Sequence, residues 1–219
     1  MTFIWEFPLT AGFAIFMILL FPFMQIFFPY AIDRYFIATP GEFQPINWLL
    51  STFFHSTFSH LFSNMFYLLI LGRVVENRVG KVRWLLFYFM AGFLSILGDW
   101  VVRGILLGDT TPVVGASGAI SGLACVAALL SPFRFPIAKN KTIPFPVFLF
   151  AWLSIYSDIT NLFARDYIAH WAHLGGFFSV FITAYFLDQK ERKEIQLGFL
   201  LNLTFFTLTI ILLFFINNR

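Results

Sequence analysis

Charge is scarce in this chain, since only 11% of its 219 residues are Asp, Glu, Lys or Arg and 59% are hydrophobic. Soluble globular domains carry about 25% charged residues. The composition therefore excludes that class and predicts an all-α polytopic membrane protein without a separate soluble domain. The short alternating segments of a membrane β-barrel are also missing, because the apolar runs are continuous.

Cysteine is nearly absent as well. The single Cys125 lies within an apolar run, which excludes a disulfide framework and favours a small core residue. Residues 1–28 lack the basic segment and the small-residue cleavage site of a signal peptide, so we expect a retained first span. The net charge of +3 comes from basic residues in short loops, where they set membrane topology, and we expect no nucleic-acid partner.

Seven apolar runs, each bounded by charges or prolines, predict seven transmembrane segments. The long connection between the first and second runs, residues 32–56, carries several aromatic residues, including Phe43 and Trp48. Aromatic side chains of this kind suit a segment that lies in the membrane interface. The runs fall at 9–31, 57–75, 84–107, 116–131, 144–162, 169–187 and 196–216.

The distribution of lysine and arginine predicts the orientation. With the N-terminus inside, ten of these residues lie in cytoplasmic loops and four on the opposite side, as the positive-inside rule requires. We therefore expect the even-numbered runs to enter from the outer face. The ten are Arg73, Arg78, Lys81, Arg83, Arg134, Lys139, Lys141, Lys190, Arg192 and Lys193, and the four are Arg34, Arg103, Arg165 and Arg219.

Ser117 stands among small residues at the start of the short fourth run. Gly118 and Gly122 form a GxxxG pair, and such pairs commonly let membrane helices pack closely. Packing is therefore the simplest interpretation of this stretch taken alone. A serine hydroxyl inside hydrocarbon nevertheless needs a polar partner.

Three further polar side chains are expected at the depth of Ser117. Ser117 and His173 lie about 22 Å from the inner ends of their runs, at 1.5 Å per residue. His60 and Asn64 lie about 24 and 18 Å from the inner end of the second run. Against a hydrocarbon core of about 30 Å, all four fall roughly 6–12 Å below the outer surface. Packing alone does not predict this convergence, because intramembrane polar groups usually face an interior or a watered cavity.

The chemistry of the four residues is complementary. Serine needs an adjacent base to act as a nucleophile, and His173 can supply one. His60 and Asn64 are spaced i, i+4 and share a helical face, from which they can donate to a developing oxyanion. Backbone N–H groups at the helix N-terminus around Ser117 would add further donors.

The chain resembles the rhomboid intramembrane serine proteases over nearly its full length. The resemblance rests on His55-x4-His60-x3-Asn64, on Gly115-Ala116-Ser117-Gly118, on Ala172-His173-Leu174-Gly175-Gly176 and on Gly72 to Gly80 with Glu76 and Arg78. It implies that Ser117 is the nucleophile, that His173 is the general base, and that His60 and Asn64 stabilise the oxyanion.

The resemblance also implies an architecture. The family fold is a six-helix core, expected here over residues 1–190, with an additional C-terminal transmembrane helix over 191–219. The connection 32–56 resembles the family's membrane-embedded loop, and the fifth run its lateral substrate gate. Two positions depart from the family pattern: Ser121 stands where many members have an aromatic residue, and Asn47-Trp48 where they have Trp-Arg. We expect Ser121 to bond back to the Ser117 carbonyl.

Other polar residues have alternative roles that their spacing favours less. His55 and His170 could join His60 and His173 in a metal site, but the spacings match no strong zinc pattern, and we expect no metal and no cofactor. Asp99 could orient a catalytic histidine, although an ion pair with Arg103 one turn away is the favoured role. Trp152 and Trp171 are interpreted as interface anchors.

We therefore expect an intramembrane serine endopeptidase that uses a Ser-His dyad on single-span membrane-protein substrates, which enter laterally from the lipid bilayer. It is expected to be a multi-pass protein of the cell membrane, with the N-terminus cytoplasmic and the site towards the outer face. The alternative is a rhomboid-like pseudoprotease that binds or escorts membrane clients. A transporter is less favoured, because paired broken helices and repeat symmetry are not evident.

Overall fold

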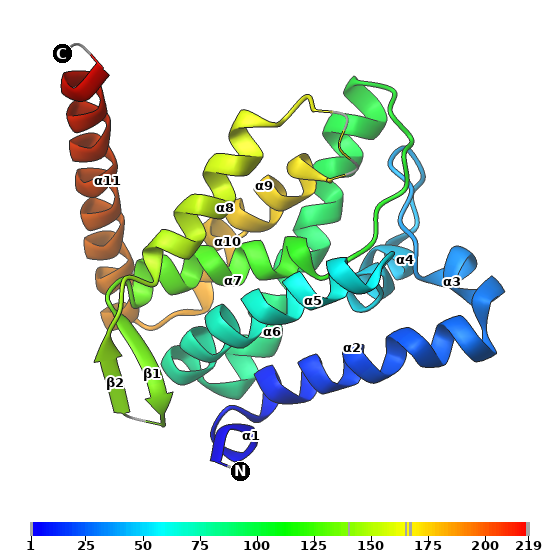
Figure 1. The fold of residues 1–219 in the computed structure, drawn as a ribbon, viewed down its shortest axis with the longest axis horizontal. Coiled ribbons are helices and arrows are strands. Elements are labelled where there is room, and N and C mark those ends of the chain that lie inside the picture. Colours follow the sequence, from blue (N-terminus) through cyan, green and yellow to red (C-terminus); the bar gives the residue numbers. More distant parts are fainter. Residues whose placement is uncertain (1, 140, 165, 167, 218–219) are drawn as a thin grey trace.

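The computed structural model describes residues 2–139, 141–164, 166 and 168–217. They form a mostly helical molecule (Figure 1). Among them, three helices are long and apolar enough to cross a membrane, and two shorter apolar helices accompany them. The long ones run over Pro8–Phe27, Phe58–Leu106 and Gln189–Ile216, and the shorter ones over Ser117–Leu130 and Phe148–Thr160. A multi-pass helical membrane protein, as the composition predicts, is confirmed.

Proline starts three of the first four helices, because the first helical position has no partner for an N–H and suits the fixed φ of proline. Trp48 is fully buried beside Phe93 and Trp100, so this ring anchors the connection to the core rather than facing the interface. The helices of this region are α1 (Thr2–Glu6), α2 (Pro8–Phe27), α3 (Pro29–Tyr35), α4 (Pro45–Leu50) and the 3-10 helix η1 (Ser51–Phe53).

The next helical stretch continues past the predicted end of the second run. Gly80, with φ 76°, adopts a conformation that only glycine takes readily, and it breaks the helix between the second and third runs. The backbone is therefore helical up to Val79 rather than to residue 75. The elements are α5 (Phe58–Tyr67), the π-helix η2 (Leu68–Gly72), α6 (Arg73–Asp99) and the π-helix η3 (Trp100–Leu106).

Helix α7 (Ser117–Leu130) lies at the centre and contacts α6, α8, α9 and α11 (Figure 1). The glycines of α7 allow its backbone to approach α6 closely. A Cβ on Gly118 would lie 1.8 Å from Ser95 Oγ, and one on Gly122 would lie 2.3 Å from the Ala91 Cβ. The GxxxG pair therefore packs α7 against α6, so the packing interpretation of this stretch holds alongside any chemical role of Ser117.

A β-hairpin follows α7, at a place where the sequence predicts only a basic loop. Its strands β1 (Arg134–Ala138) and β2 (Lys141–Pro144) pair in antiparallel fashion. The chain continues through α8 (Phe148–Thr160), α9 (His170–Phe178), α10 (Val180–Thr183), the 3-10 helix η4 (Ala184–Phe186) and α11 (Gln189–Asn217). Helix α11 begins seven residues before the predicted seventh run, because Asp188 and Glu191 cap its first turn reciprocally.

Two ion pairs lie at one end of the bundle. Arg78 pairs with Glu194 and Arg83 with Glu191, which ties the start of α11 to α6. Figure 1 shows the hairpin, the N-terminal helix and the start of α11 together at this end, while α3 and η3 lie away from it. Most of the basic loops counted for the orientation therefore share one face of the molecule.

Candidate active site

Ser117 is the first residue of α7, and the turn before it is fixed by Gly115. Gly115 has φ 135°, and its N–H donates to the Ser51 carbonyl at 2.9 Å. A Cβ at this position would lie 2.7 Å from Cε1 of His60, so only glycine fits between the imidazole and the turn. The arrangement brings the Ser117 hydroxyl and the free N–H groups of the first helical turn to the same side as His60.

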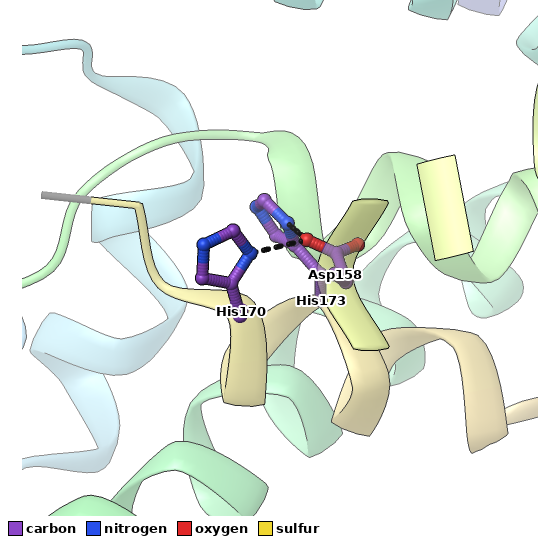
Figure 2. Close-up of side chains that lie close together, drawn as sticks. All are labelled: Asp158, His170 and His173. Atoms are coloured by element: carbon purple, nitrogen blue, oxygen red, sulfur yellow. Dashed lines mark hydrogen bonds and ion pairs between the residues drawn. The ribbon is translucent and has the colours of Figure 1, made fainter. Parts of the chain in front are cut away.

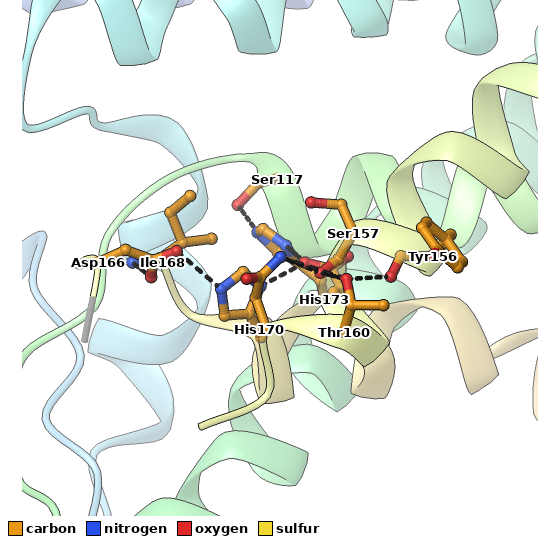
Figure 3. Close-up of polar contacts among 10 residues, drawn as sticks. Ser117, Tyr156, Ser157, Thr160, Asp166, Ile168, His170 and His173 are labelled. Carbon is orange, nitrogen blue, oxygen red and sulfur yellow. Dashed lines mark hydrogen bonds and ion pairs between the residues drawn. The ribbon is translucent and has the colours of Figure 1, made fainter. Parts of the chain in front are cut away.

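His173 is brought to Ser117 by close packing of backbones. A Cβ on Gly176 would lie 1.9 Å from the Gly118 carbonyl oxygen, and one on Gly175 would lie 2.7 Å from the Leu94 carbonyl oxygen. Helix α9 can therefore lie directly against α7 and α6. In this position Nε2 of His173 is 2.8 Å from Oγ of Ser117 (Figure 3).

His60 and Asn64 line the same cavity as Ser117 and His173. Its volume is about 620 Å³. The backbone N–H of His60 donates to Oγ1 of Thr57, which caps α5, and Nδ1 of the His60 ring lies 3.3 Å from Oγ of Ser56. Asn64 donates one amide hydrogen to the His60 carbonyl at 2.9 Å, which leaves its second amide hydrogen available.

The structure adds a carboxylate that is not among the residues predicted for the site. Oδ1 of Asp158, near the end of α8, is 2.8 Å from Nδ1 of His173 (Figure 2). Asp99, which was weighed for this position, is instead 3.2 Å from Arg103, so the predicted ion pair is confirmed. The sequence marks Asp158 as a lone carboxylate in an apolar run. It does not identify His173 as the partner, because this contact depends on how α8 packs on α9.

A second histidine shares this carboxylate. Nδ1 of His170 is also 2.8 Å from Oδ1 of Asp158, and its Nε2 is 3.2 Å from Oδ2 of Asp166 (Figures 2 and 3). Desolvation raises the pKa of Asp166. Hydrogen bonds from the Ile168 N–H and from His170 lower the same pKa by more than this, so it lies below its usual value. Asp166 is thereby favoured as an anion beside His170.

The same three side chains are also the set that a divalent metal would use. Ligand atoms of Asp158, His170 and His173 lie within 4.8 Å of one another. Two imidazoles and one carboxylate are a common transition-metal ligand set. Hydrogen bonds from both Nδ1 atoms to the carboxylate account for the cluster without an ion. The grouping differs from the one weighed in the sequence, since His55 and His60 do not take part.

Two other predicted residues have different surroundings. His55 is fully buried, and its ring packs edge-on against His60 with centroids 5.1 Å apart. Neither of its ring nitrogens has a hydrogen-bond partner in the described part of the chain. Ser121 is buried and lines the cavity with Ser117. Among the described residues its hydroxyl makes no hydrogen bond to the Ser117 carbonyl, so the predicted back-bond is not observed.

Comparisons with known proteins give the family. A model of the Rhomboid domain matches residues 42–190, which is more than half of the chain. "Presenilin-associated rhomboid-like protein, mitochondrial" of Bos taurus is 30% identical over 152 residues, covering 65% of this chain and 38% of the relative. "Putative rhomboid protease YdcA" of Bacillus subtilis (strain 168) is 29% identical over 140 residues, covering 64% of this chain and 66% of the relative.

A chloroplast relative matches a shorter stretch. "Rhomboid-like protein 11, chloroplastic" of Arabidopsis thaliana is 38% identical over 80 residues, which is 36% of this chain and 27% of the relative. The chain thus spans less than two fifths of the length of the mitochondrial relative from Bos taurus. The match of the domain model over residues 42–190 covers α4 to η4, including all the site residues described above. This chain belongs to the rhomboid family.

Proposed function

We propose that the chain is an intramembrane serine endopeptidase in which Ser117 and His173 act as a catalytic dyad. The observation that carries the proposal is the 2.8 Å contact between Nε2 of His173 and Oγ of Ser117 at a cavity of about 620 Å³. A serine hydroxyl becomes a nucleophile when a base at this distance accepts its proton. The relative named "Putative rhomboid protease YdcA" supports the same activity.

The reaction would proceed by acyl transfer. Oγ of Ser117 attacks the carbonyl carbon of the scissile peptide bond while its proton passes to Nε2 of His173. The oxyanion formed in this step accepts hydrogen bonds from His60, from the second amide hydrogen of Asn64 and from first-turn N–H groups of α7. His173 then gives the proton to the leaving amine, and water hydrolyses the ester on Ser117 by the same steps.

Substrates would be single-span membrane proteins that enter from the lipid beside α8. A regular helix hides its carbonyls in backbone hydrogen bonds, so the segment to be cut must unwind locally. We assign residues 1–190 to a six-helix protease core and residues 191–219 to an added seventh helix. The basic residues gathered at the end that holds the hairpin favour a cytoplasmic location for that end, with the site towards the outer face of the cell membrane.

Fluorophosphonate labelling tests the proposal directly. Detergent-solubilised wild type should form a covalent adduct, Ser117→Ala should form none, and the exposed serine variant Ser157→Ala should label like the wild type. His173→Ala should abolish cleavage of a single-span substrate in membranes. Equal labelling of wild type and Ser117→Ala would reject the nucleophile, and a folded wild type that neither labels nor cleaves would favour the pseudoprotease.

The oxyanion donors give a graded test. Asn64→Ala should lower kcat by about 10²–10³-fold, the usual cost of losing one such donor. His60→Ala should cost a similar factor, and the two losses should not add if both side chains serve one oxyanion. An effect confined to KM would instead assign these residues to substrate binding.

A further inference from the structure

The acceptor chemistry of Asp158 fixes which nitrogen of His173 carries a hydrogen. A carboxylate can only accept, so the 2.8 Å contact requires Nδ1 of His173 to donate. Nε2 of the neutral ring is then left with a lone pair directed at the Ser117 hydroxyl. This is the tautomer that a general base needs. Without Asp158, nothing in this contact pattern would favour it over the other tautomer.

His170 is a second hydrogen-bond partner of Asp158. Both histidines reach the same oxygen, Oδ1, and the second nitrogen of His170 faces Asp166. Because both neighbours of His170 are carboxylates, its two contacts are complete only when both ring nitrogens carry hydrogen. His170 can then offset the charge of Asp158, whose side chain is only 5% exposed. A buried carboxylate is costly unless such partners accompany it.

The aligned groups come from three different helices. Ser117 begins α7 and His173 lies in α9 (Figure 3), and Asp158 lies near the end of α8 (Figure 2). The titratable groups that face His173 are Asp158 from α8, His170 from its own helix, and at longer range His60 from α5 and Asp99 from α6. Of these, only Asp158 bonds to the ring nitrogen opposite Ser117.

From this geometry we propose that Asp158 is the positioning residue of the site, which completes a Ser117–His173–Asp158 triad, and that His170, tethered to Asp166, holds Asp158 in place. The proposal rests on the proposed peptidase function. In the transition state the imidazolium of His173 gains a direct ionic partner in Asp158. The alignment of the base then depends on how α9 packs against α8, and α8 is the helix beside which substrates are proposed to enter.

Kinetics of Asp158→Asn test the proposal. The amide keeps the shape but can donate to Nδ1, which favours the wrong tautomer, and we expect kcat to fall by about 10²–10⁴-fold with KM changed little. The acid limb of the kcat/KM profile should move to lower pH, because the imidazolium loses its carboxylate. Asp158→Glu should keep the acid limb near that of wild type, and the exposed control Asp33→Asn should match wild type throughout.

His170→Gln gives an intermediate case, since it removes the residue that holds Asp158 while leaving the triad atoms. We expect a smaller loss of kcat than in Asp158→Asn and an acid limb close to that of wild type. Wild-type kcat in Asp158→Asn would overturn the proposal. So would a lowered kcat with an unmoved acid limb, which is the result of a purely structural contact between α8 and α9.

Two further measurements keep the outcomes separate. A metal chelator should leave the kcat of the wild type unchanged, and a change in kcat would assign the cluster to a metal instead.

If the folded wild type neither labels nor cleaves, the peptidase function fails by itself. The positioning role is then judged by nitrogen NMR of labelled histidine in wild type and Asp158→Asn, where an unchanged His173 tautomer would overturn it. If Asp158→Asn does not fold, the comparison is made with Asp158→Glu, whose acid limb must stay with that of wild type.

Discussion

Helices α7 and α11 are both apolar, yet they meet their surroundings in opposite ways. All residues of α7 except Ser117 and Leu129 are buried, whereas in the described part of α11 only Glu191, Gly198 and Asn202 are buried. The difference follows from side-chain size. Helix α7 is rich in Gly, Ala and Ser, which let neighbouring backbones approach, and α11 is rich in Phe and Leu, which suit lipid. Hydropathy alone predicts that a segment spans the membrane. The size of its side chains indicates whether the helix faces other helices or lipid.

The contacts of α11 with the rest of the molecule include one close backbone approach and one buried amide. A Cβ on Gly198 would lie 1.9 Å from the Leu129 carbonyl oxygen, so α11 touches the backbone of α7 there. Asn202 donates to the Ala128 carbonyl at 3.0 Å and accepts from Trp152 Nε1 at 2.7 Å. This one amide therefore joins α11 to both α7 and α8. Trp152, interpreted from the sequence as an interface anchor, is a helix-to-helix contact.

The largest loss of stability is expected at Gly176, where α9 lies against the backbone of α7. In Gly176→Ala the new Cβ would lie 1.9 Å from the Gly118 carbonyl oxygen, which is backbone and cannot swing aside. We expect a loss of unfolding free energy at the upper end for overpacking, about 3 kcal/mol, and loss of Ser117 labelling because α9 moves away from α7. Thermal melting in detergent and fluorophosphonate labelling measure the two effects. Gly12→Ala is the matched control, since a Cβ there meets nothing within 4 Å, and a wild-type melt of Gly176→Ala would contradict the close packing.

Gly198→Ala tests whether α11 is an attachment rather than part of the core. The clash with the Leu129 carbonyl oxygen has the same 1.9 Å distance as that in Gly176→Ala, but it lies between α11 and α7. We expect a smaller fall in melting temperature, with Ser117 labelling retained, because the contact of His173 with Ser117 does not involve α11. Limited proteolysis between η4 and α11 should become faster. Complete loss of labelling would show that α11 is required for the site.

Asn202→Leu is a milder change, because it removes the amide hydrogen bonds of α11 to α7 and α8 without adding a backbone clash. Hydrogen bonds between membrane helices contribute about 0.6 kcal/mol on average and up to about 1.7 kcal/mol. We expect a loss of unfolding free energy in that range, measured by thermal melting. Thr204→Val, on the exposed face of the same helix, is the control for a polar-to-apolar change. Equal melting temperatures of the two variants would mean that Asn202 does not hold α11.

Much of this arrangement was predictable from the sequence, and the remainder depends on packing. Run length and composition predicted helical segments at α2, α7 and α8, and the polar residues Ser117, His173, His60 and Asn64 were expected together, as they are found around one cavity. Their catalytic roles remain predictions.

The features that the sequence did not predict depend on contacts between distant segments. The hairpin β1–β2 pairs short, largely exposed strands whose alternation is too weak to stand out among basic residues. The partner of Asp158 is not evident from the sequence, because a carboxylate two residues before the end of α8 gives no sign of its contact with His173 until α9 is packed beside it. The burial of Trp48 likewise depends on Phe93 and Trp100, far along the chain.

The smallest expected effect concerns the ion pairs that tie α11 to α6. Side chains of Arg78 and Glu194 are 29% and 33% exposed, and exposed pairs usually contribute between about 0 and 1 kcal/mol. Glu194→Gln should therefore lower the melting temperature slightly at low salt and not at high salt, where screening has already weakened the pair. Glu191→Gln should cost more, because Glu191 is only 11% exposed beside Arg83, although glutamine can keep its cap on the Asp188 N–H. If both variants melt like the wild type at low salt, the charges at this end serve orientation alone, and the apolar and amide contacts of Gly198 and Asn202 carry the attachment of α11.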